Sequence, residues 1–496
     1  MPLRITCRAA EPLDLRADVT ALGVFVFNRE LPAPLTPLDA LLGGGITKLL
    51  AKEEFTGKKD QSLSIPMLGR GPSERLVLIG LGEKTAVGDG DVRALAAKAA
   101  RLTNVDRSAH LVLGIPIELQ EHLRAAAEGL ELGAYRFTKY LTGDRRPKTE
   151  LDEVTVAIAH KPGAKTKRAI ELGQRVALAI NQARDLSNEP GNALPPEGLA
   201  AAAQAVAKEH DLKIHVFDHK EILRRGMKLI DAVGRGSVHE PRFVHIEYVP
   251  KKAKKRLVFV GKGITFDSGG VSIKPAAGMG EMKHDMSGAA NVIGLMDAVA
   301  VLQPEVEVHG IVACAENMPD GNAYRPGDVW GSLDGKTVEI INTDAEGRLL
   351  LADALAYARA LAPDLLVDNA TLTGACVVAL GTTCSGYYAS NDATAELFRR
   401  AVKASGEQMW QLPLLEDLRE QLKSEVADIK QTGDRFGGSI TAALFLREFI
   451  GEAKHWVHVD IAGPASTERL LGWAQSKGAT GHGVLTFLAL VEQAAE

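Results

Sequence analysis

The chain has 496 residues, of which 46% are hydrophobic and 24% charged, a composition typical of a soluble globular protein. This length exceeds what one hydrophobic core usually holds, so we expect at least two domains. The net charge of −5 argues against a general affinity for nucleic acid or acidic membranes, although a basic stripe formed across an oligomer would leave DNA binding open.

Cysteine use and the N-terminus both point to the cytoplasm. The four cysteines, Cys7, Cys314, Cys376 and Cys384, form no C-x-x-C pair and no disulfide scaffold, which fits a reducing compartment. The N-terminus lacks the apolar core of a signal peptide. No apolar run approaches the ~18 residues that a membrane-spanning helix needs. The sequence therefore predicts a cytoplasmic protein that does not enter membranes.

The first part of the chain alternates strand-like with helix-like segments. Strands are expected at residues 21–27, 75–82, 109–115 and 153–160, and helices at 91–102 and 119–137. A long amphipathic helix follows at 166–188 and ends at the Pro- and Gly-rich run EPGNALPPEGL. We therefore predict an N-terminal α/β domain over residues 1–165, a connecting helix over 166–189 and a C-terminal domain over 190–496.

The second part repeats the alternation with stronger strands. These are expected at residues 213–218, 243–249, 256–267, 306–317, 337–342, 364–374 and 455–463, with helices at 285–302, 348–361, 393–406 and 439–450. Strands alternating with helices are typical of a mixed, mostly parallel sheet flanked by helices. We expect this α/β architecture in both domains.

Several common catalytic and binding signatures are absent. The chain contains no H-E-x-x-H and no G-x-S-x-G motif, which argues against a zincin metalloprotease and an α/β-hydrolase. The run GSLDGKT at 331–337 is one residue short of a phosphate-binding P-loop, and a strand follows it, so we predict an Asp-Gly turn between two strands. The basic run KKAKKR at 251–256 precedes an apolar strand and is interpreted as a solvated turn.

The stretch INTDAEGRLLLADAL, residues 341–355, places three charged side chains between a strand and a helix. They are Asp344, Glu346 and Arg348. A solvated loop with an acidic helix start would explain one acid, but not two acids and an arginine within five residues. Junctions of this kind in α/β sheets are where ligands bind.

Two further junctions carry charge. The stretch VFVGKGITFDSGGVSIKP at 258–275 contains Lys262, Asp267 and Lys274, and Asp285 directly precedes a helix of small residues. Lys262 is unusual, because a charged lysine in a central strand is costly to bury. A neighbouring carboxylate would satisfy it as an ion pair. Alternatively, a bound metal ion would lower its pKa and make the amine a ligand.

The carboxylates of these junctions suggest a metal site. Asp267, Asp285, Asp344 and Glu346 would repel one another if they converged without cations. Two divalent ions, typically ~3.5–4 Å apart, need bridging carboxylates of this kind. Oxygen ligands with one amine favour Mg²⁺ or Mn²⁺ by ligand type alone. Lys274 and Arg348 remain for substrate oxygens or a small anion.

These blocks resemble the leucyl aminopeptidase family, the bacterial-type cytosolic metallo-aminopeptidases. NTDAEGRL at 342–349 is similar to that family's signature octapeptide. SNEPGNALPP, GKGITFDSGG, SIKP, KHDMSGAA, DNATLTGA and HVDIAGPA match further blocks of the family in the expected order. The resemblance covers residues 180–490 and, more loosely, the N-terminal domain. It implies a metal-dependent aminopeptidase that removes leucine and other bulky apolar residues from peptides by attack of metal-activated water.

The resemblance also implies a ligand set for two metal ions. Asp267 and Glu346 would bridge the ions, Lys262 and Asp285 would complete the tighter site, and Asp344 would complete the more exchangeable one. The family implies Zn²⁺, with Mn²⁺ or Co²⁺ able to enter the looser site.

Catalytic and substrate-binding roles follow from the same resemblance. Lys274 would polarise the scissile carbonyl, and Arg348 would hold a bicarbonate that relays protons. The pocket for the first side chain would be lined by Met282, Thr371 and Gly374. Because every polar role is filled by the residue type that the family uses, we expect an active enzyme and, by resemblance, a homohexamer built as a dimer of trimers.

Some alternatives stay open on the sequence. His284, His455 and His458 are tempting ligands, but we interpret them as packing or supporting residues. Another binuclear metal hydrolase, such as a phosphoesterase, would also use Lys274 and Arg348 to bind its substrate. An accessory DNA-binding role, known among bacterial members of the family, finds no support in the net charge.

Overall fold

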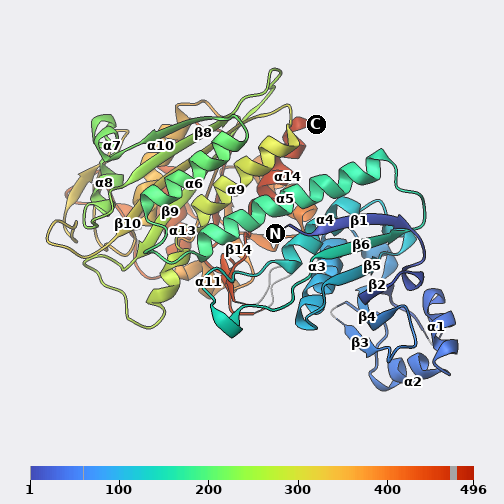
Figure 1. Cartoon of the computed structure of the whole chain (residues 1–496). Coiled ribbons are helices and arrows are strands. Elements are labelled where there is room, and N and C mark those ends of the chain that lie inside the picture. The colour runs from blue at the N-terminus through green and yellow to red at the C-terminus, as the bar shows by residue number, and fades with distance from the viewer. Residues whose placement is uncertain (1, 29, 60, 470–476) are drawn as a thin grey trace. The chain divides into compact units, whose positions relative to one another are not determined.

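The structure, a computed structural model, describes residues 2–28, 30–59, 61–469 and 477–496. Contacts divide the chain into two compact units, the first ending at Leu178 and the second beginning at Ala179. Helix α5 (Ala164–Asn188) contains this division. Each unit has its own sheet and its own helices (Figure 1).

The first unit contains a six-stranded sheet. Its order is β1 (Arg4–Ala9), β6 (Glu153–Ile158), β5 (His110–Gly114), β2 (Ala17–Phe25), β4 (Ser73–Gly82) and β3 (Ser62–Pro66). All neighbours pair in parallel except β3, which is antiparallel to β4. Its α-helices are α1 (Thr36–Leu41), α2 (Gly45–Lys52), α3 (Asp89–Val105) and α4 (Leu123–Ala134).

Apolar residues on both faces of this sheet explain why helices cover both. In β4, Leu76 and Leu78 join a cluster with residues of α1 and α2. Val77 and Ile79, which point to the opposite face, join a cluster with residues of α3 and α4. Strands buried on both faces are typical of parallel sheets. The predicted α/β architecture of this part of the chain is confirmed.

The second unit contains an eight-stranded mixed sheet. Its order is β15 (Met409–Gln411), β14 (Ser385–Ala389), β17 (Trp456–Asp460), β13 (Leu365–Ala370), β9 (Arg256–Asp267), β10 (Glu307–Asn317), β8 (Arg242–Tyr248) and β7 (Lys213–Phe217). The four central strands, from β17 to β10, are parallel. A small sheet combines β11 (Val329–Gly331), β12 (Thr337–Glu339) and β16 (Ile429–Lys430), and β18 (Ser466–Thr467) pairs with β19 (Gly478–Ala479).

Nine α-helices beyond α5 are described in this unit. They are α6 (Pro196–Glu209), α7 (His219–Arg225), α8 (Lys228–Gly234), α9 (Ser287–Leu302), α10 (Gly347–Arg359), α11 (Gly374–Leu380), α12 (Asp392–Ser405), α13 (Gly438–Arg447) and α14 (Val484–Ala495). Figure 1 shows α6 and α9 running beside one another over the sheet, and the part of α5 that begins at Ala179 lies against α9.

Side-chain alternation along β9 decides which residues reach the site. Val258 and Val260 belong to the core cluster that contains much of α10. Phe259, between them, points the other way and meets Phe487 of α14, with ring centroids 5.6 Å apart. Because successive side chains of a strand alternate, Lys262 continues the row of Val258 and Val260 toward the start of α10.

The structure corrects three expectations. The strand expected at 337–342 ends at Glu339 and belongs to the small sheet, so the charged loop before α10 does not follow a strand of the main sheet. The helix expected at 119–137 is confined to Leu123–Ala134, because a short 3₁₀ turn precedes it. Residues 279–302 contain an 18-residue stretch that by length and composition could cross a membrane, against the expectation of no such run, but 83% of that stretch is buried in the core.

The predicted Asp-Gly turn between two strands is confirmed. β11 and β12 pair in antiparallel fashion on either side of the turn that contains Asp334 and Gly335. Gly335 has a φ of 91°, a conformation that favours glycine. This geometry excludes a phosphate-binding loop followed by a helix at these residues.

Candidate active site

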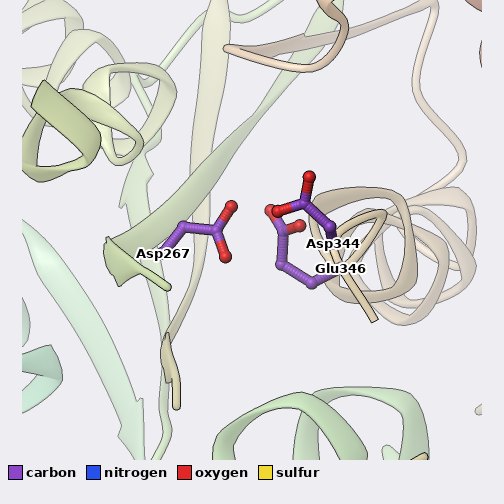
Figure 2. Close-up of side chains that lie close together, drawn as sticks. All are labelled: Asp267, Asp344 and Glu346. Atoms are coloured by element: carbon purple, nitrogen blue, oxygen red, sulfur yellow. The ribbon is translucent and has the colours of Figure 1, made fainter. Parts of the chain in front are cut away.

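Three carboxylates meet in the second unit where β9 ends and α10 begins. Asp267 is the last residue of β9, and Asp344 and Glu346 lie in the loop that precedes α10. One oxygen from each lies within 4.8 Å of the others, and Figure 2 shows the three groups facing one another. Asp267 and Glu346 are buried, whereas 34% of the Asp344 side chain is exposed. The cluster therefore has one open side.

Lys262 contacts this cluster from an almost fully buried position. Its ammonium group contacts Asp285 at 2.7 Å and Glu346 at 2.8 Å, and it donates a hydrogen bond to the Thr371 carbonyl at 2.8 Å. Burial opposes its charge, but the neighbouring carboxylates outweigh burial and raise the pKa of Lys262 above its ordinary value. The ion pair that the sequence left open for this lysine is present.

A glycine makes the position of Lys262 possible. A Cβ atom on Gly347, the first residue of α10, would lie 2.4 Å from Lys262 Cε. Any larger residue at the start of the helix would therefore force the Lys262 side chain or the helix to shift. Close packing of Gly347 against Lys262 therefore explains why the NTDAEGR run has glycine at this position.

Lys274 approaches the cluster from the glycine-rich loop after β9. Its ammonium group contacts Asp267 at 2.8 Å and also pairs with Asp344. Burial opposes its charge, but these carboxylates raise its pKa above the ordinary value. With 18% of its side chain exposed, Lys274 is more accessible to a substrate than Lys262 is.

Asp285 supplies a fourth carboxylate, just before α9. Its Oδ1 accepts a hydrogen bond from the Thr371 hydroxyl at 2.7 Å, whereas its buried Oδ2 has no hydrogen-bond partner among the described residues. Burial raises the pKa of this carboxyl well above its usual range. A buried oxygen without a donor is costly unless a cation approaches it.

The donor set fits divalent metal ions. Four carboxylates face two ammonium groups, which leaves an excess of negative charge in a largely buried space. Carboxylate oxygens with an amine suit Mg²⁺, Mn²⁺ or Zn²⁺, and the unpaired Asp285 Oδ2 is a further available ligand atom.

Arg348 lies in the first turn of α10 and is nearly fully buried. One Nη donates to the Gln431 carbonyl at 2.9 Å, and its Nε has no hydrogen-bond partner in the described part of the chain. Burial lowers the pKa of Arg348 to about 10, so the guanidinium is still charged at neutral pH. A buried cation with an unused donor is suited to holding a small anion.

Of the three residues expected to line a substrate pocket, Thr371 and Met282 make hydrogen bonds to residues of this cluster. Thr371, which follows β13, is joined to it through Lys262 and Asp285. Met282 lies in the 3₁₀ helix Met279–His284, and its carbonyl accepts from the Asp285 amide at 3.2 Å. Gly374, the exposed first residue of α11, has nothing within 4 Å of the place a Cβ would take. Open space at Gly374 is compatible with a bound side chain.

The three histidines make structural hydrogen bonds, as expected. His284 Nδ1 lies 3.2 Å from the Ser187 hydroxyl, and His455 Nδ1 lies 2.7 Å from the Thr394 hydroxyl. His458, completely buried, pairs with Asp368 at 2.6 Å. Each ring is anchored outside the carboxylate cluster.

Two supporting residues were not anticipated from the sequence. Asn317, at the end of β10, donates from Nδ2 to Asp267 Oδ1 at 2.7 Å and to the Thr343 carbonyl at 3.0 Å. Gln431, fully buried after β16, accepts from two backbone amides of the charged loop and donates to the Ala345 carbonyl at 2.9 Å. Asn317 ends a predicted strand, as Asp267 does, which is a usable signal. Gln431 has no local signal.

Comparison with known proteins finds relatives along nearly the whole chain. A model of the cytosol aminopeptidase family, catalytic domain, matches residues 181–488, and a model of that family's N-terminal domain matches residues 21–144. A probable cytosol aminopeptidase of Aquifex aeolicus (strain VF5) is 44% identical over 476 residues, covering 95% of each chain. Another, of Persephonella marina (strain DSM 14350 / EX-H1), is 42% identical over 482 residues, covering 95% of this chain and 96% of the relative.

Solved structures extend the likeness to the fold. A mutant of tomato leucine aminopeptidase has a TM-score of 0.89 at 32% identity, covering 99% of this chain and 96% of that one. The bottromycin maturation enzyme BotP in complex with Mn has a TM-score of 0.84 at 35% identity, covering 97% of this chain and 100% of that one. The likeness therefore covers both units of the chain.

Proposed function

Because the chain belongs to the cytosol aminopeptidase family, we propose that it releases leucine and other bulky apolar residues from the N termini of peptides. As a member of this family it is a metal-dependent aminopeptidase, and its substrates are peptides. The observation that carries the proposed metal chemistry is the convergence of Asp267, Asp344 and Glu346 from two separate segments, and the preference for a bulky first residue rests on the space at Gly374.

The carboxylate cluster would hold two divalent ions per subunit. Asp267 and Glu346 would bridge them, Lys262 and Asp285 would complete one site, and Asp344 would complete the other. The buried Asp285 Oδ2 and the partly exposed Asp344 support a tighter and a more exchangeable site, respectively. We propose Zn²⁺ or Mn²⁺ as the ions, with Co²⁺ or Mg²⁺ as substitutes; Mn is the metal of the solved BotP complex.

The basic residues of the site would supply the remaining chemistry. When bound, the metal ions would activate water and polarise the scissile carbonyl as Lewis acids. Lys274, the more exposed lysine, would donate to the carbonyl oxygen as negative charge develops on it. Arg348 would hold a bicarbonate that accepts and relays protons, since its Nε has no hydrogen-bond partner among the described residues and His284, His455 and His458 bond to other groups.

The substrate side chain would lie against Met282, Thr371 and Gly374. The open space at Gly374 supports a bulky apolar first residue, because nothing there would meet even an added Cβ. We retain the domain limits of the sequence, with residues 190–496 as the catalytic domain. We also propose a homohexamer and a cytoplasmic location, which rest on the family relationship alone.

Two rates test the proposed function. Hydrolysis of leucine p-nitroanilide with added Mn²⁺ is measured for the parent and for Asp344→Ala, with circular dichroism to verify folding. Glu452→Ala, which removes an exposed acid outside the cluster, is the matched control. We expect activity in the parent and the control, a loss of about a hundredfold or more in Asp344→Ala, and none on the N-acetylated substrate.

Inactivity of the parent with Zn²⁺, Mn²⁺ and Co²⁺ alike would refute the catalytic proposal. Activity on alanine or arginine p-nitroanilide well above that on the leucine substrate would refute only the proposed preference. Full activity in Asp344→Ala would remove this residue from the proposed ligands.

A further inference from the structure

A polar pocket of about 320 Å³ lies in the second unit, outside the carboxylate cluster. Arg235, which follows α8, forms one wall, and the segment from Gly321 to Trp330 forms the rest. Its charged side chains are two arginines, Arg235 and Arg325, and one acid, Asp328. The lining therefore carries more positive than negative charge.

Arg235 lies over an aromatic ring but makes no ion pair with the described residues. Its guanidinium carbon lies over the Trp330 ring, 5.0 Å from the centroid. No carboxylate of the described residues lies within ion-pair distance of it, and its Nε makes no hydrogen bond there. A cation–π contact with an indole helps to hold a guanidinium in place, and a guanidinium that makes no ion pair is available to a planar oxyanion.

The acid in the lining is already engaged. Asp328 pairs with the Arg325 guanidinium at 3.1 Å and accepts from the Arg325 amide at 3.0 Å. Its ion pair is made with Arg325 and not with Arg235. The Trp330 indole N–H is a second buried donor that has no acceptor in the described part of the chain. Donors left without partners in a native structure call for a missing acceptor.

We propose that this pocket binds a small oxyanion, a carboxylate or a phosphate-type group, with Arg235 as its main partner. Arg325, 72% exposed, would add a weaker contact from the rim. The proposal goes beyond aminopeptidase activity and does not depend on it, because it concerns binding outside the carboxylate cluster.

The pocket is connected to the loop that carries Asp344. Gly327 and Asp328 exchange backbone hydrogen bonds with Ile340, at 2.7 and 2.9 Å. The buried Tyr324 hydroxyl donates to the Thr343 carbonyl at 2.7 Å. An oxyanion in the pocket would thus stabilise a segment on which the charged loop rests.

Trp330 offers a reporter at the site itself. Indole emission of the full-length, metal-loaded protein is followed while sodium sulfate, or sodium acetate, replaces sodium chloride at constant ionic strength. We expect a saturable change in the millimolar range that disappears in Trp330→Phe. Arg235→Gln should weaken half-saturation by about tenfold, and Arg325→Gln by about threefold. A stronger response to sulfate assigns a phosphate-type ligand, and a stronger response to acetate assigns a carboxylate.

The matched control is Arg225→Gln. The guanidinium carbon of Arg225 also lies over an aromatic ring, 4.1 Å from the Phe217 centroid, but Arg225 pairs with Glu221 and lies outside the pocket. This variant should respond like the parent. Arg235→Lys, which keeps the charge but loses the planar fork, covers the case in which Arg235→Gln does not fold. An equal response in the parent and the folded Arg235 variant, or no saturable change up to about 50 mM of either anion, would overturn the proposal.

Discussion

Replacing Gln431 by leucine tests whether the loop that carries Asp344 and Glu346 depends on a side chain from a distant segment. Gln431 Oε1 accepts from the amides of Ile341 and Asn342, at 3.0 and 3.1 Å, and Nε2 donates to the Ala345 carbonyl at 2.9 Å. One side chain therefore ties both ends of the loop. Leucine replaces the carboxamide by an apolar side chain of comparable bulk and removes all three hydrogen bonds.

The contacts set the size of the expected effect. At about 1 kcal/mol for each hydrogen bond, the variant loses about 3 kcal/mol of interaction. If half of that loss appears as disorder of the loop in the folded protein, metal affinity falls by about tenfold, since 1.4 kcal/mol is a factor of ten. The other half appears as a lower free energy of unfolding.

Two measurements separate these contributions. Titration calorimetry gives Mn²⁺ affinity after metal removal, and thermal unfolding gives stability. Asn104→Leu is the matched control, because buried Asn104 accepts from the Leu151 amide at 2.8 Å and donates to the Ala134 carbonyl at 3.2 Å, all within the first unit. It should lose stability without losing Mn²⁺ affinity. If Gln431→Leu behaves in the same way, the loop does not depend on Gln431 and the reasoning is refuted.

Four further predictions concern the site and its surroundings. Gly347→Ala should lower the rate of leucine p-nitroanilide hydrolysis by about tenfold or more, because its Cβ would lie 2.4 Å from Lys262 Cε. Gly331→Ala is the control and should keep the parent rate, because a Cβ there has nothing within 4 Å. Equal activities of the two variants would contradict the packing argument. Lys262→Met should weaken Mn²⁺ binding if the amine is a ligand and strengthen it if the lysine only compensates charge, and calorimetry distinguishes the two signs. Chelation with EDTA should abolish activity and lower the melting temperature. Mn²⁺ at about a hundred times its Kd should restore about 2.7 kcal/mol to the free energy of unfolding. A melting temperature that is the same with and without metal would contradict this. Burial, reinforced by His309, lowers the pKa of His245 to about 4, so the unfolded chain binds a proton that the folded chain does not. The free energy of unfolding should therefore fall as the pH drops from about 6.5 toward 4, by at most about 1.4 kcal/mol per pH unit, and His245→Gln should flatten that slope in urea unfolding.

Strong periodic segments were predictable because their own residues decide the element. The strand predicted at 256–267 is β9, Arg256–Asp267, and the long helix predicted at 166–188 is α5, Ala164–Asn188. Strand β1 was missed because it is short, contains few apolar residues and lies at the sheet edge, where it is mostly exposed. Its place depends on pairing with β6, more than a hundred residues later, which a local window does not contain.

Residues of the candidate site were likewise predictable where they stand in a local sequence block, and not where they act from a distant segment. Asp267, Asp285, Asp344, Glu346 and the three basic residues each stand in a recognisable local block, so the sequence identified them and the resemblance assigned them roles. Asn317 and Gln431 act across the fold. Asn317 pairs in register with Asp267 only because β9 and β10 are neighbours after an irregularity in the ladder. Side chains that orient a site from distant segments carry no local pattern, and only the fold reveals them.

Lys262 shows why the two interpretations of a buried charge could not be separated by sequence. As an ion-pair partner it needs carboxylates within hydrogen-bond distance, and as a metal ligand it needs the same carboxylates around a shared ion. The alternation of β9 and the missing side chain of Gly347 satisfy both requirements at once, since they bring its nitrogen to within 2.8 Å of Asp285 and Glu346. Burial alone would favour the neutral amine, whereas the carboxylates favour the ammonium. Bound divalent ions would compensate the charge of the carboxylates in place of the ammonium group. Lys262 would then be neutral, and a neutral amine is less costly to bury than a charged one.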